Sequence, residues 1–389
     1  MKKIAILEST GSIGNSTLNV IEANPGVFSI TLLTAESNVD SIFNQIKKFK
    51  PKYVYLNDGS SSKELNSRLS SENLKTSLLN EKDYLDTIAS NDVEIVVAGV
   101  VGIAGLKSIH KAVSAGKRIL LANKEAYVVA GELLNTLAEL NESTIFPIDS
   151  EHSAIHQCLS GKKDTPVGVK KIILTGSGGP FLNRNLKEFI HITPEEAVMH
   201  PVWKMGKKIS VDSATMMNKG LEVIEAKWLF KIDSEKIGIL VHPEGIVHSL
   251  VEFEDASLLA QMSVPDMKIP IAYGLGFPER IRSNSQRLSL EKIEQLNFCK
   301  PDLKKFPSIG MSRASLDSGG TSPSLLNAAN EEAVRAFLDK KICFTQITEI
   351  ISFVMDTIPI KNVKELENIF QADTLARKSA LTRIHQLRS

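Results

Sequence analysis

The sequence predicts an α/β protein whose first domain is a parallel sheet with crossover helices. The chain opens with a short apolar run, Ile4 to Leu7, followed by a glycine turn and then by apolar residues at helical spacing. Further apolar runs alternate with helical patterns as far as residue 149. From residue 237 short apolar runs follow one another closely, and from Thr321 onward the pattern is helical. We therefore expect an N-terminal Rossmann-type domain, a central α+β domain and a C-terminal helical domain.

Composition excludes several classes of protein. The 389 residues suffice for two or three domains, and a formal net charge of +1 gives no sign of a nucleic-acid or membrane surface. No apolar run approaches the roughly 20 residues that span a bilayer, and the N-terminus passes directly into a strand without the apolar core of a signal peptide. Three cysteines, odd in number and far apart, argue against a disulfide framework. We expect a cytoplasmic protein.

The first glycine turn follows the strand of residues 4–7. Gly11 would let the backbone approach a pyrophosphate at the start of the next helix, and Gly14 would allow that helix to pack closely on the strand. The G-x-x-G-x-x-G form is incomplete because Glu8 stands at its first glycine, so this carboxylate must point away from a pyrophosphate. A tight turn without a ligand remains an alternative interpretation.

The second strand, Phe28 to Ala35, ends in Glu36-Ser37-Asn38, where the ribose of a dinucleotide would lie. An acid at this position commonly binds the 2′-hydroxyl of NAD, whereas a basic residue accommodates the 2′-phosphate of NADP. No lysine or arginine occurs between residues 31 and 46. These residues therefore do not indicate a preference for NADP, and Glu36 could equally be a solvated loop residue.

Two later strands end in residues that could face the same cleft. Residues 94–102 form an apolar run into glycines, and residues 118–122 form another that ends in Asn123-Lys124-Glu125. Carboxyl ends of parallel strands are where ligands bind in such sheets. The alternative is a helix cap followed by surface charges.

A further strand, residues 144–148, ends at Asp149, and Ala154, Ile155 and Leu159 then recur at helical spacing. Asp149 and Glu151 therefore lie at a strand-to-helix corner, although an ordinary N-cap explains them as well. The pattern of residues 213–228 predicts one helix with Asn218, Lys219, Glu222 and Glu225 on a polar arc. A solvated face is the usual explanation of such an arc. With Glu222 as a third carboxylate, however, the acids suit Mg²⁺ or Mn²⁺ rather than zinc.

Between these segments, residues 161–169 are predicted to be a loop, and the glycine loop of residues 175–180 could form an anion-binding nest. Residues 200–208, which contain His200, Trp203, Met205 and three lysines, resemble a mobile flap over an anionic ligand. The alternatives are a plain glycine loop and a partly buried surface loop.

The second half of the chain is predicted to contain a mixed or antiparallel sheet and then helices. Strands are expected at 238–241, 246–251 and 258–262, and helices at 327–334, 345–357, 362–370 and 373–388. An apolar strand group without covering helices usually meets a partner, so a homodimer built on residues 237–262 is expected. The alternative is that the C-terminal helices cover this face within one chain. The expected domains are 1–149 for dinucleotide binding, 150–277 for catalysis and dimerisation, 278–306 as linker and 307–389 as helical domain.

Six sequence blocks together resemble the 1-deoxy-D-xylulose 5-phosphate reductoisomerase family. They are STGSIG at 9–14, LLANKE at 120–125, PIDSEHSAI at 147–155, LTGSGGPF at 174–181, HPVWKMGKKISVDSATMMNKGLE at 200–222 and NAANE at 327–331. They occur in the family's order along the whole chain. The chain departs from the family pattern at Glu8, Glu36 and Ser37, all on the cofactor side.

The resemblance implies an NADPH-dependent oxidoreductase that rearranges 1-deoxy-D-xylulose 5-phosphate and reduces the resulting aldehyde to 2-C-methyl-D-erythritol 4-phosphate. It implies Mg²⁺ or Mn²⁺, a sugar-phosphate substrate and a homodimer. By this resemblance the metal ligands are Asp149, Glu151 and Glu222, and the catalytic residues are Lys219, Glu151 and His200. The implied substrate-binding residues are Ser150, Glu151, Ser177, His200, Trp203, Ser213, Asn218, Lys219 and Glu222. The implied cofactor-binding residues are Thr10, Gly11, Ser12, Ile13, Glu36, Ser37, Asn38, Asn123, Lys124, Glu125 and Gly206.

Two other classes of protein share the architecture. A homoserine-dehydrogenase-like reductase would not need the flap, the serines and the three carboxylates together. A non-catalytic nucleotide-binding relative would be expected to lack some of Asp149, Glu151, Glu222 and Lys219, and all four are present.

Overall fold

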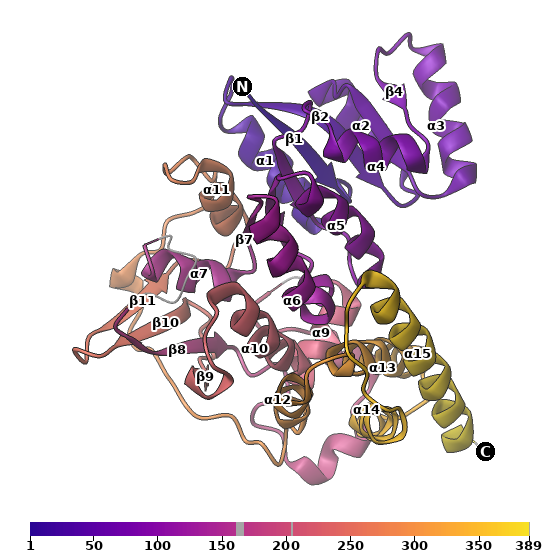
Figure 1. Ribbon diagram of the computed structural model, residues 1–389. Coiled ribbons are helices and arrows are strands. Elements are labelled where there is room, and N and C mark those ends of the chain that lie inside the picture. The colour runs from indigo at the N-terminus through magenta and orange to yellow at the C-terminus, as the bar shows by residue number, and fades with distance from the viewer. Residues whose placement is uncertain (161–166, 204, 389) are drawn as a thin grey trace. The chain divides into compact units, whose positions relative to one another are not determined.

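The computed structural model describes residues 1–160, 167–203 and 205–388, and the chain divides into two compact units. The first consists of Met1–Ala126, Leu134–Ser153 and Asp266–Gln286, and the second consists of Tyr127–Leu133, Ala154–Pro265 and Arg287–Ser389. Most of the predicted loop at 161–169, and Lys204 of the predicted flap, lie outside the described residues. The predicted α/β class with a helical C-terminal region is confirmed (Figure 1).

The first unit is built on a seven-stranded sheet in which all the paired strands are parallel, in the order β4-β3-β2-β1-β5-β6-β7. Its strands are β1 (Lys2–Leu7), β2 (Phe28–Ala35), β3 (Tyr53–Leu56), β4 (Ser77–Leu78), β5 (Ile95–Ala98), β6 (Arg118–Leu121) and β7 (Thr144–Pro147). The central strand β1 is buried from Ile4 to Leu7 and pairs with β2 and β5. Strands β2, β5 and β6 are buried over most of their length, as expected of parallel strands that are covered on both faces. The carboxyl ends of β1, β2, β5, β6 and β7 consequently share one edge.

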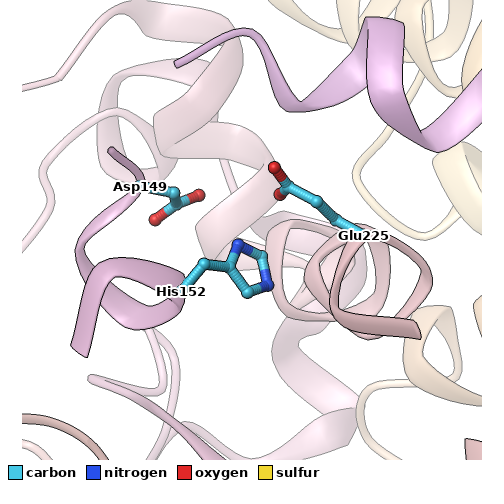
Figure 2. Close-up of side chains that lie close together, drawn as sticks. All are labelled: Asp149, His152 and Glu225. Atoms are coloured by element: carbon cyan, nitrogen blue, oxygen red, sulfur yellow. The ribbon is translucent and has the colours of Figure 1, made fainter. Parts of the chain in front are cut away.

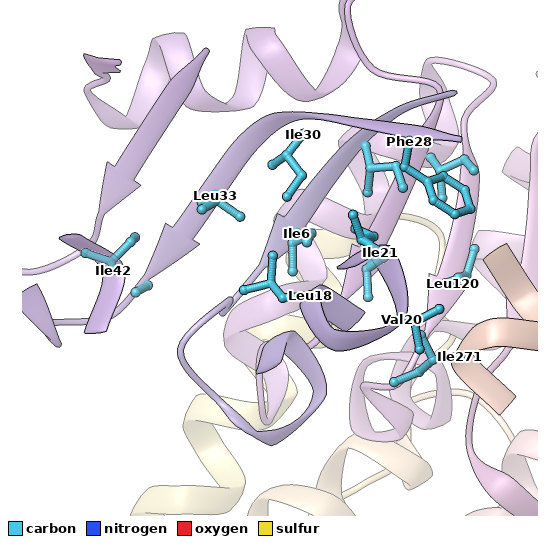
Figure 3. Packing of buried hydrophobic residues seen from close by; sticks show 14 of the residues in the cluster. Ile6, Leu18, Val20, Ile21, Phe28, Ile30, Leu33, Ile42, Leu120 and Ile271 are labelled. Atoms are coloured by element: carbon cyan, nitrogen blue, oxygen red, sulfur yellow. The ribbon is translucent and has the colours of Figure 1, made fainter. Parts of the chain in front are cut away.

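Helices connect successive strands of this sheet. They are α1 (Ser12–Glu22), α2 (Val39–Phe49), α3 (Gly59–Ser71), α4 (Glu81–Ala89), the 3₁₀ turn η1 (Ile103–Gly105) with α5 (Leu106–Ser114), and α6 (Lys124–Leu140). The apolar faces of α1, α2 and α3 join the core that Figure 3 shows around Ile6, Leu18 and Leu33. Ile271 of α11 (Lys268–Gly276) belongs to the same core. Residues 266–286, which the sequence divided between the catalytic domain and the linker, are therefore part of the first unit.

The second unit contains a four-stranded mixed sheet in the order β11-β10-β8-β9. Its strands are β8 (Val169–Gly176), β9 (Ile237–Val241), β10 (Val247–Phe253) and β11 (Leu258–Met262). β8 runs parallel to β9 and antiparallel to β10, so it lies between two strands that follow it by more than 60 residues. The predicted mixed sheet is thus confirmed, and β11 forms one of its edges.

The helices of the second unit include α8 (Pro194–Ala197) and α12 (Ser308–Ser318), which were not predicted, and they differ from the predicted helices at two further places. Further helices of this unit are α9 (Lys207–Ala214), α10 (Met217–Phe230), α13 (Ser322–Leu338), α14 (Gln346–Thr357) and α15 (Leu366–Arg388). The single helix predicted for 213–228 is wrong, because Met216 takes a left-handed conformation with φ 59° between α9 and α10. The two helices predicted at 362–370 and 373–388 are one continuous helix, α15.

Phenylalanine rings hold part of this helical region together. Phe344 has an edge-on contact with each of Phe181, Phe189 and Phe337, at ring-centroid distances of 5.5–5.7 Å. Such contacts add stability beyond the burial of apolar area. Among the described residues, no helix combines the length and the apolar character that crossing a membrane requires.

Candidate functional site

The turn between β1 and α1 is shaped for close approach of the backbone. A Cβ atom at Gly14 would lie 2.3 Å from Cα of Ser9, so only glycine fits where the helix crosses the strand. Gly11 occupies the N-cap of α1, which has no side-chain cap and no acid in its first turn. By contrast, α2, α3, α4 and α6 each begin with an asparagine or aspartate that accepts a backbone N–H. The N–H groups of α1 therefore fit the pyrophosphate of a dinucleotide.

Glu8 has a positive φ of 59°, a conformation that favours glycine. Its Oε1 accepts the hydroxyl of Thr10 at 2.7 Å, and its Oε2 accepts the backbone N–H of Glu36 at 3.1 Å. The carboxylate is therefore tied to the turn and to the end of β2. These two bonds compensate the backbone conformation and fix the direction of the side chain.

The ends of β5 and β6 are joined by Asn123. Its Oδ1 accepts the N–H of Ala126 at 3.1 Å, which caps α6, and its Nδ2 donates to the carbonyl of Gly102 at 2.9 Å. Asn123 thus has the capping role that sequence reasoning kept as an alternative, and it also links two loops at the carboxyl edge of the sheet. The next residue, Lys124, forms an ion pair with Asp149 beyond β7.

The corner after β7 leads into α7 (Ser150–Cys158). The carbonyl of Asp149 accepts the N–H of Ser153 at 2.8 Å, and the hydroxyl of Ser150 donates to Oε2 of Glu151 at 2.6 Å. Figure 2 shows the side chains of Asp149 and His152 at this corner, and that of Glu225, which α10 supplies. His152 is fully buried, and sequence reasoning did not single it out.

Helix α10 presents its polar arc to the protein interior rather than to solvent. Glu222 is fully buried; its Oε1 accepts Nδ2 of Asn218 at 2.6 Å, and its Oε2 is paired with the ammonium group of Lys219. Glu225, one turn further on, is also fully buried. Sequence reasoning placed Glu225 on this arc without a role, and the spacing of three residues from Glu222 was the available signal. Burial of two carboxylates on one arc excludes the solvated-face interpretation.

The glycine loop after β8 brings Ser177 to His200. The Nε2 atom of His200 lies 3.0 Å from Oγ of Ser177, while its Nδ1 accepts the N–H groups of Val202 at 3.2 Å and Trp203 at 2.8 Å. Because Nδ1 accepts, the neutral imidazole carries its proton on Nε2 and donates it to Ser177. The imidazole is thereby oriented by the backbone of the flap itself.

The same loop lies against the end of α9. A Cβ atom at Gly179 would lie 2.7 Å from the carbonyl oxygen of Ser213, so the glycine allows the loop to approach that serine. The flap ends at residue 206 rather than at residue 208 as predicted, because α9 begins at Lys207 with Gly206 as its N-cap. Lys208 of α9 forms an ion pair with Asp212 at 2.8 Å.

Fold and side chains together define a dinucleotide-binding α/β oxidoreductase with buried acids suited to a divalent cation. Family models agree with this class: residues 4–131 match 1-deoxy-D-xylulose 5-phosphate reductoisomerase, residues 145–230 match its C-terminal domain, and residues 262–379 match the DXP reductoisomerase C-terminal domain. The chain belongs to the 1-deoxy-D-xylulose 5-phosphate reductoisomerase family.

Relatives match over almost the full length. The chain is 46% identical to 1-deoxy-D-xylulose 5-phosphate reductoisomerase from Nitrosomonas eutropha, covering 98% of this chain and 93% of the relative. It is 45% identical to the protein of that name from Psychromonas ingrahamii, covering 98% of each.

Solved structures of this family have the same fold as this chain. A DOX-P reductoisomerase crystallised with NADPH, fosmidomycin and magnesium matches at a TM-score of 0.95, 41% identity and full coverage of both chains. The enzyme of Zymomonas mobilis in complex with NADPH matches at 0.91 and 40% identity, covering 98% of this chain and 99% of that one.

Proposed function

We propose that this chain converts 1-deoxy-D-xylulose 5-phosphate and NADPH into 2-C-methyl-D-erythritol 4-phosphate with the help of Mg²⁺ or Mn²⁺. The reaction rearranges the carbon skeleton and then reduces the aldehyde, a step in non-mevalonate isoprenoid precursor biosynthesis. Full-length relatives that carry the name of this activity support the proposal. Related structures whose descriptions name NADPH, fosmidomycin and magnesium support the cofactors.

The observation that carries this function is the environment of Glu222. A fully buried carboxylate is costly unless its charge is balanced. Asn218 and Lys219 hold Glu222 from the preceding turn of the same helix, which leaves the orientation of its carboxyl group little freedom. Such outer support is typical of side chains that ligate a metal ion.

We assign the metal ion to Asp149, Glu151 and Glu222. The described residues offer two groups whose composition could hold a cation, this one and Asp149, His152 and Glu225. Three carboxylates suit the hard cations Mg²⁺ and Mn²⁺ better than the group with an imidazole does. A cation bound there would act as a Lewis acid toward the carbonyl and hydroxyl oxygens of the substrate.

The remaining polar residues bind and orient the sugar phosphate. Ser177 accepts Nε2–H of His200, so its own O–H group is oriented and can donate to a phosphate oxygen of the substrate without large rearrangement. Lys219 places a positive charge beside the developing oxyanion, and Glu151, whose partner is Ser150, can accept a substrate proton. Ser213, Asn218 and Trp203 complete this substrate-binding set.

The proposed cofactor residues follow the carboxyl edge of the first sheet, except Gly206, which is the N-cap of α9 in the second unit. The uncapped start of α1, with Thr10, Gly11, Ser12 and Ile13, would hold the pyrophosphate. Glu36, Ser37 and Asn38 would face the ribose, and Asn123, Lys124, Glu125 and Gly206 would line the nicotinamide side. NADPH supplies the hydride that reduces the aldehyde.

A spectroscopic assay tests this function. Purified protein is incubated with 1-deoxy-D-xylulose 5-phosphate, Mg²⁺ and NADPH, while absorbance of the reduced nicotinamide is followed and the product is identified by mass spectrometry. We expect cofactor oxidation that needs both the substrate and the metal. Oxidation that persists in excess chelator, or a product other than 2-C-methyl-D-erythritol 4-phosphate, would contradict the proposal.

The oligomeric state and the cellular location belong to the same proposal. Leu258 and Leu259 are 53% and 48% exposed on β11, an edge strand, and an exposed apolar edge is normally covered. We assign this edge to a homodimer, so light scattering at micromolar concentration should give twice the chain mass, and a monomeric mass would end the idea. Free thiols at Cys158, Cys299 and Cys343 fit the reducing cytoplasm.

A further inference from the structure

The adenosine end of the cofactor site carries two carboxylates where a phosphate would have to bind. Glu36 follows β2 directly and is exposed to solvent. Both of its carboxylate oxygens accept Nδ2 of Asn57, at 3.0 and 3.1 Å, and Asn57 in turn accepts the hydroxyl of Tyr55 at 3.1 Å. The Glu36 side chain is therefore held at the ends of β2 and β3 and still has lone pairs for further donors.

Glu8 brings a second negative charge to the same place. Its carboxylate accepts the backbone N–H of Glu36 at 3.1 Å and the hydroxyl of Thr10 at 2.7 Å. An N–H at the end of β2, which could otherwise donate to a ligand, is thus engaged by an acid. Glu8 has a left-handed backbone conformation, and its carboxylate stays within the turn between β1 and α1.

Three cations of α2 and α3 have acidic partners. Lys47 pairs with Glu72 at 2.7 Å, and Lys48 pairs with Glu22 at 2.7 Å. Arg68 pairs with Asp40 and Glu64, both at 2.6 Å. No lysine or arginine lies among residues 31–46, so a dianionic 2′-phosphate at the end of β2 would meet the acids Glu8 and Glu36, whereas ribose hydroxyls would meet good acceptors.

We propose that Glu36, fixed by Asn57 and supported by Glu8, accepts the ribose hydroxyls of the adenosine moiety, so that NADH serves this chain as a cofactor at least as well as NADPH. This inference rests on the proposed function and specifies its cofactor. Glu36 is the specificity-determining residue, and Asn57 and Glu8 act through it.

Direct binding tests the proposal without turnover. Dissociation constants for NADH and NADPH are measured by nicotinamide fluorescence, and those for 5′-AMP and 2′,5′-ADP by calorimetry. The members of each pair differ only at the 2′ position. We expect NADH to bind within threefold of NADPH or more tightly, and 2′,5′-ADP to bind no better than 5′-AMP. A preference for NADPH of more than threefold would overturn the proposal.

Substitutions assign the effect to Glu36. In Glu36→Gln the ratio of the NADPH constant to the NADH constant should fall at least fivefold, because the repulsion of the 2′-phosphate is removed. Glu22→Gln on α1 removes the same charge from an exposed ion pair and should leave the ratio unchanged. A ratio that moves less than fivefold in Glu36→Gln, or equally in both variants, would contradict the role of Glu36.

Turnover at saturating NADPH separates this proposal from the proposed function. A chain that turns over 1-deoxy-D-xylulose 5-phosphate but binds NADPH more than threefold more tightly than NADH overturns the cofactor inference alone. A chain that binds both dinucleotides as expected but forms no product overturns the proposed function and leaves the ribose-binding role of Glu36 supported.

Discussion

The ammonium group of Lys219 is paired with the carboxylate of Glu222 one turn further along α10, and both side chains are almost completely buried. A buried ion pair is a weak source of stability, because desolvation offsets most of the attraction. Its value here is positional: Lys219 and Asn218 hold the Glu222 carboxyl group from one side, which leaves its other face for a cation.

The first prediction concerns Glu222→Gln. The amide keeps the size of the side chain and one accepting oxygen for Asn218 or Lys219, but it removes the negative charge that a metal ion requires. We expect an unchanged circular dichroism spectrum and a kcat reduced by about a hundredfold or more, since a Lewis acid supplies several kcal/mol to such a reaction. Full activity, or a loss that excess Mg²⁺ does not partly relieve, would contradict metal ligation by Glu222.

The second prediction concerns Ser177→Ala. The hydroxyl of Ser177 accepts the proton on Nε2 of His200 and is proposed to bind the substrate phosphate. Losing one charge-assisted hydrogen bond should raise the KM for substrate by about tenfold, corresponding to roughly 1.4 kcal/mol, and should leave NADPH binding unchanged. Ser318→Ala, an exposed serine of α12, is the matched control. An unchanged KM would show that Ser177 only orients the imidazole.

The third prediction concerns the flap, residues 200–206. Trp203 is half-buried, with its ring centroid 6.1 Å from that of His248, and His200 accepts two N–H groups of the flap backbone. Closure over a phosphorylated substrate would bury further apolar area and exclude water from the aldehyde. Hydrogen exchange over 200–206 should slow when a phosphonate analogue binds. Trp203→Ala should weaken use of the substrate while cofactor binding persists, and equal exchange with and without the analogue would indicate a fixed loop.

Much of this arrangement could be predicted from the sequence because it depends on local patterns. Short apolar runs ending in polar residues predicted the strands of the first sheet, and Gly14, where a Cβ atom would lie 2.3 Å from Ser9, marks the close crossing of helix and strand. The acids at the ends of β7 and on α10 were found because their spacing places them at a corner and on one arc.

Other features depend on contacts that a linear pattern does not record. Met216 interrupts the predicted helix by adopting a left-handed conformation, for which a non-glycine residue gives no sequence signal. Helix α11 is apolar and buried almost throughout. Its composition predicts that it is buried but does not predict to which of the two units it belongs. The ties between Glu8, Glu36 and Asn57 join residues from three different strand ends.

The fourth prediction concerns the thiol of Cys158 in α7. Burial raises its pKa to about 11, so the reactive thiolate is scarce at neutral pH. The folded pKa lies above the unfolded value, so the thiol contributes stability below about pH 8.5 that is lost as the pH rises toward 11. Iodoacetamide at pH 8 should modify the exposed Cys299 well before Cys158, as mass spectrometry of the peptides would show. Equal rates at the two cysteines would mean that the end of α7 opens readily.

The fifth prediction concerns Arg377 of α15, which joins three acids. Its guanidinium donates to Glu331 at 2.6 Å, to Glu332 at 2.9 Å and to Asp373 at 2.7 and 2.9 Å. Burial alone would lower the pKa of Arg377, but these hydrogen bonds raise it above its usual value, so the group stays charged. The side chain of Arg377 is 21% exposed and those of its partners are 14% exposed or less. Water therefore cannot fully replace the guanidinium group as a hydrogen-bond donor to the three carboxylates.

Arg377→Gln would leave three carboxylates facing one another with one weak donor between them. Removing one partner of a buried ion pair costs about 3–5 kcal/mol, and the partial exposure of this cluster lowers that cost, so the thermal midpoint should fall by several degrees. Lys378→Gln, the exposed neighbour on the same helix, should stay within about 0.5 kcal/mol of the unaltered chain. Because Arg377 lies outside the proposed site, kcat at 25 °C should not change in either variant. Equal midpoints for the two variants would show that Arg377 contributes no more to stability than a surface charge does.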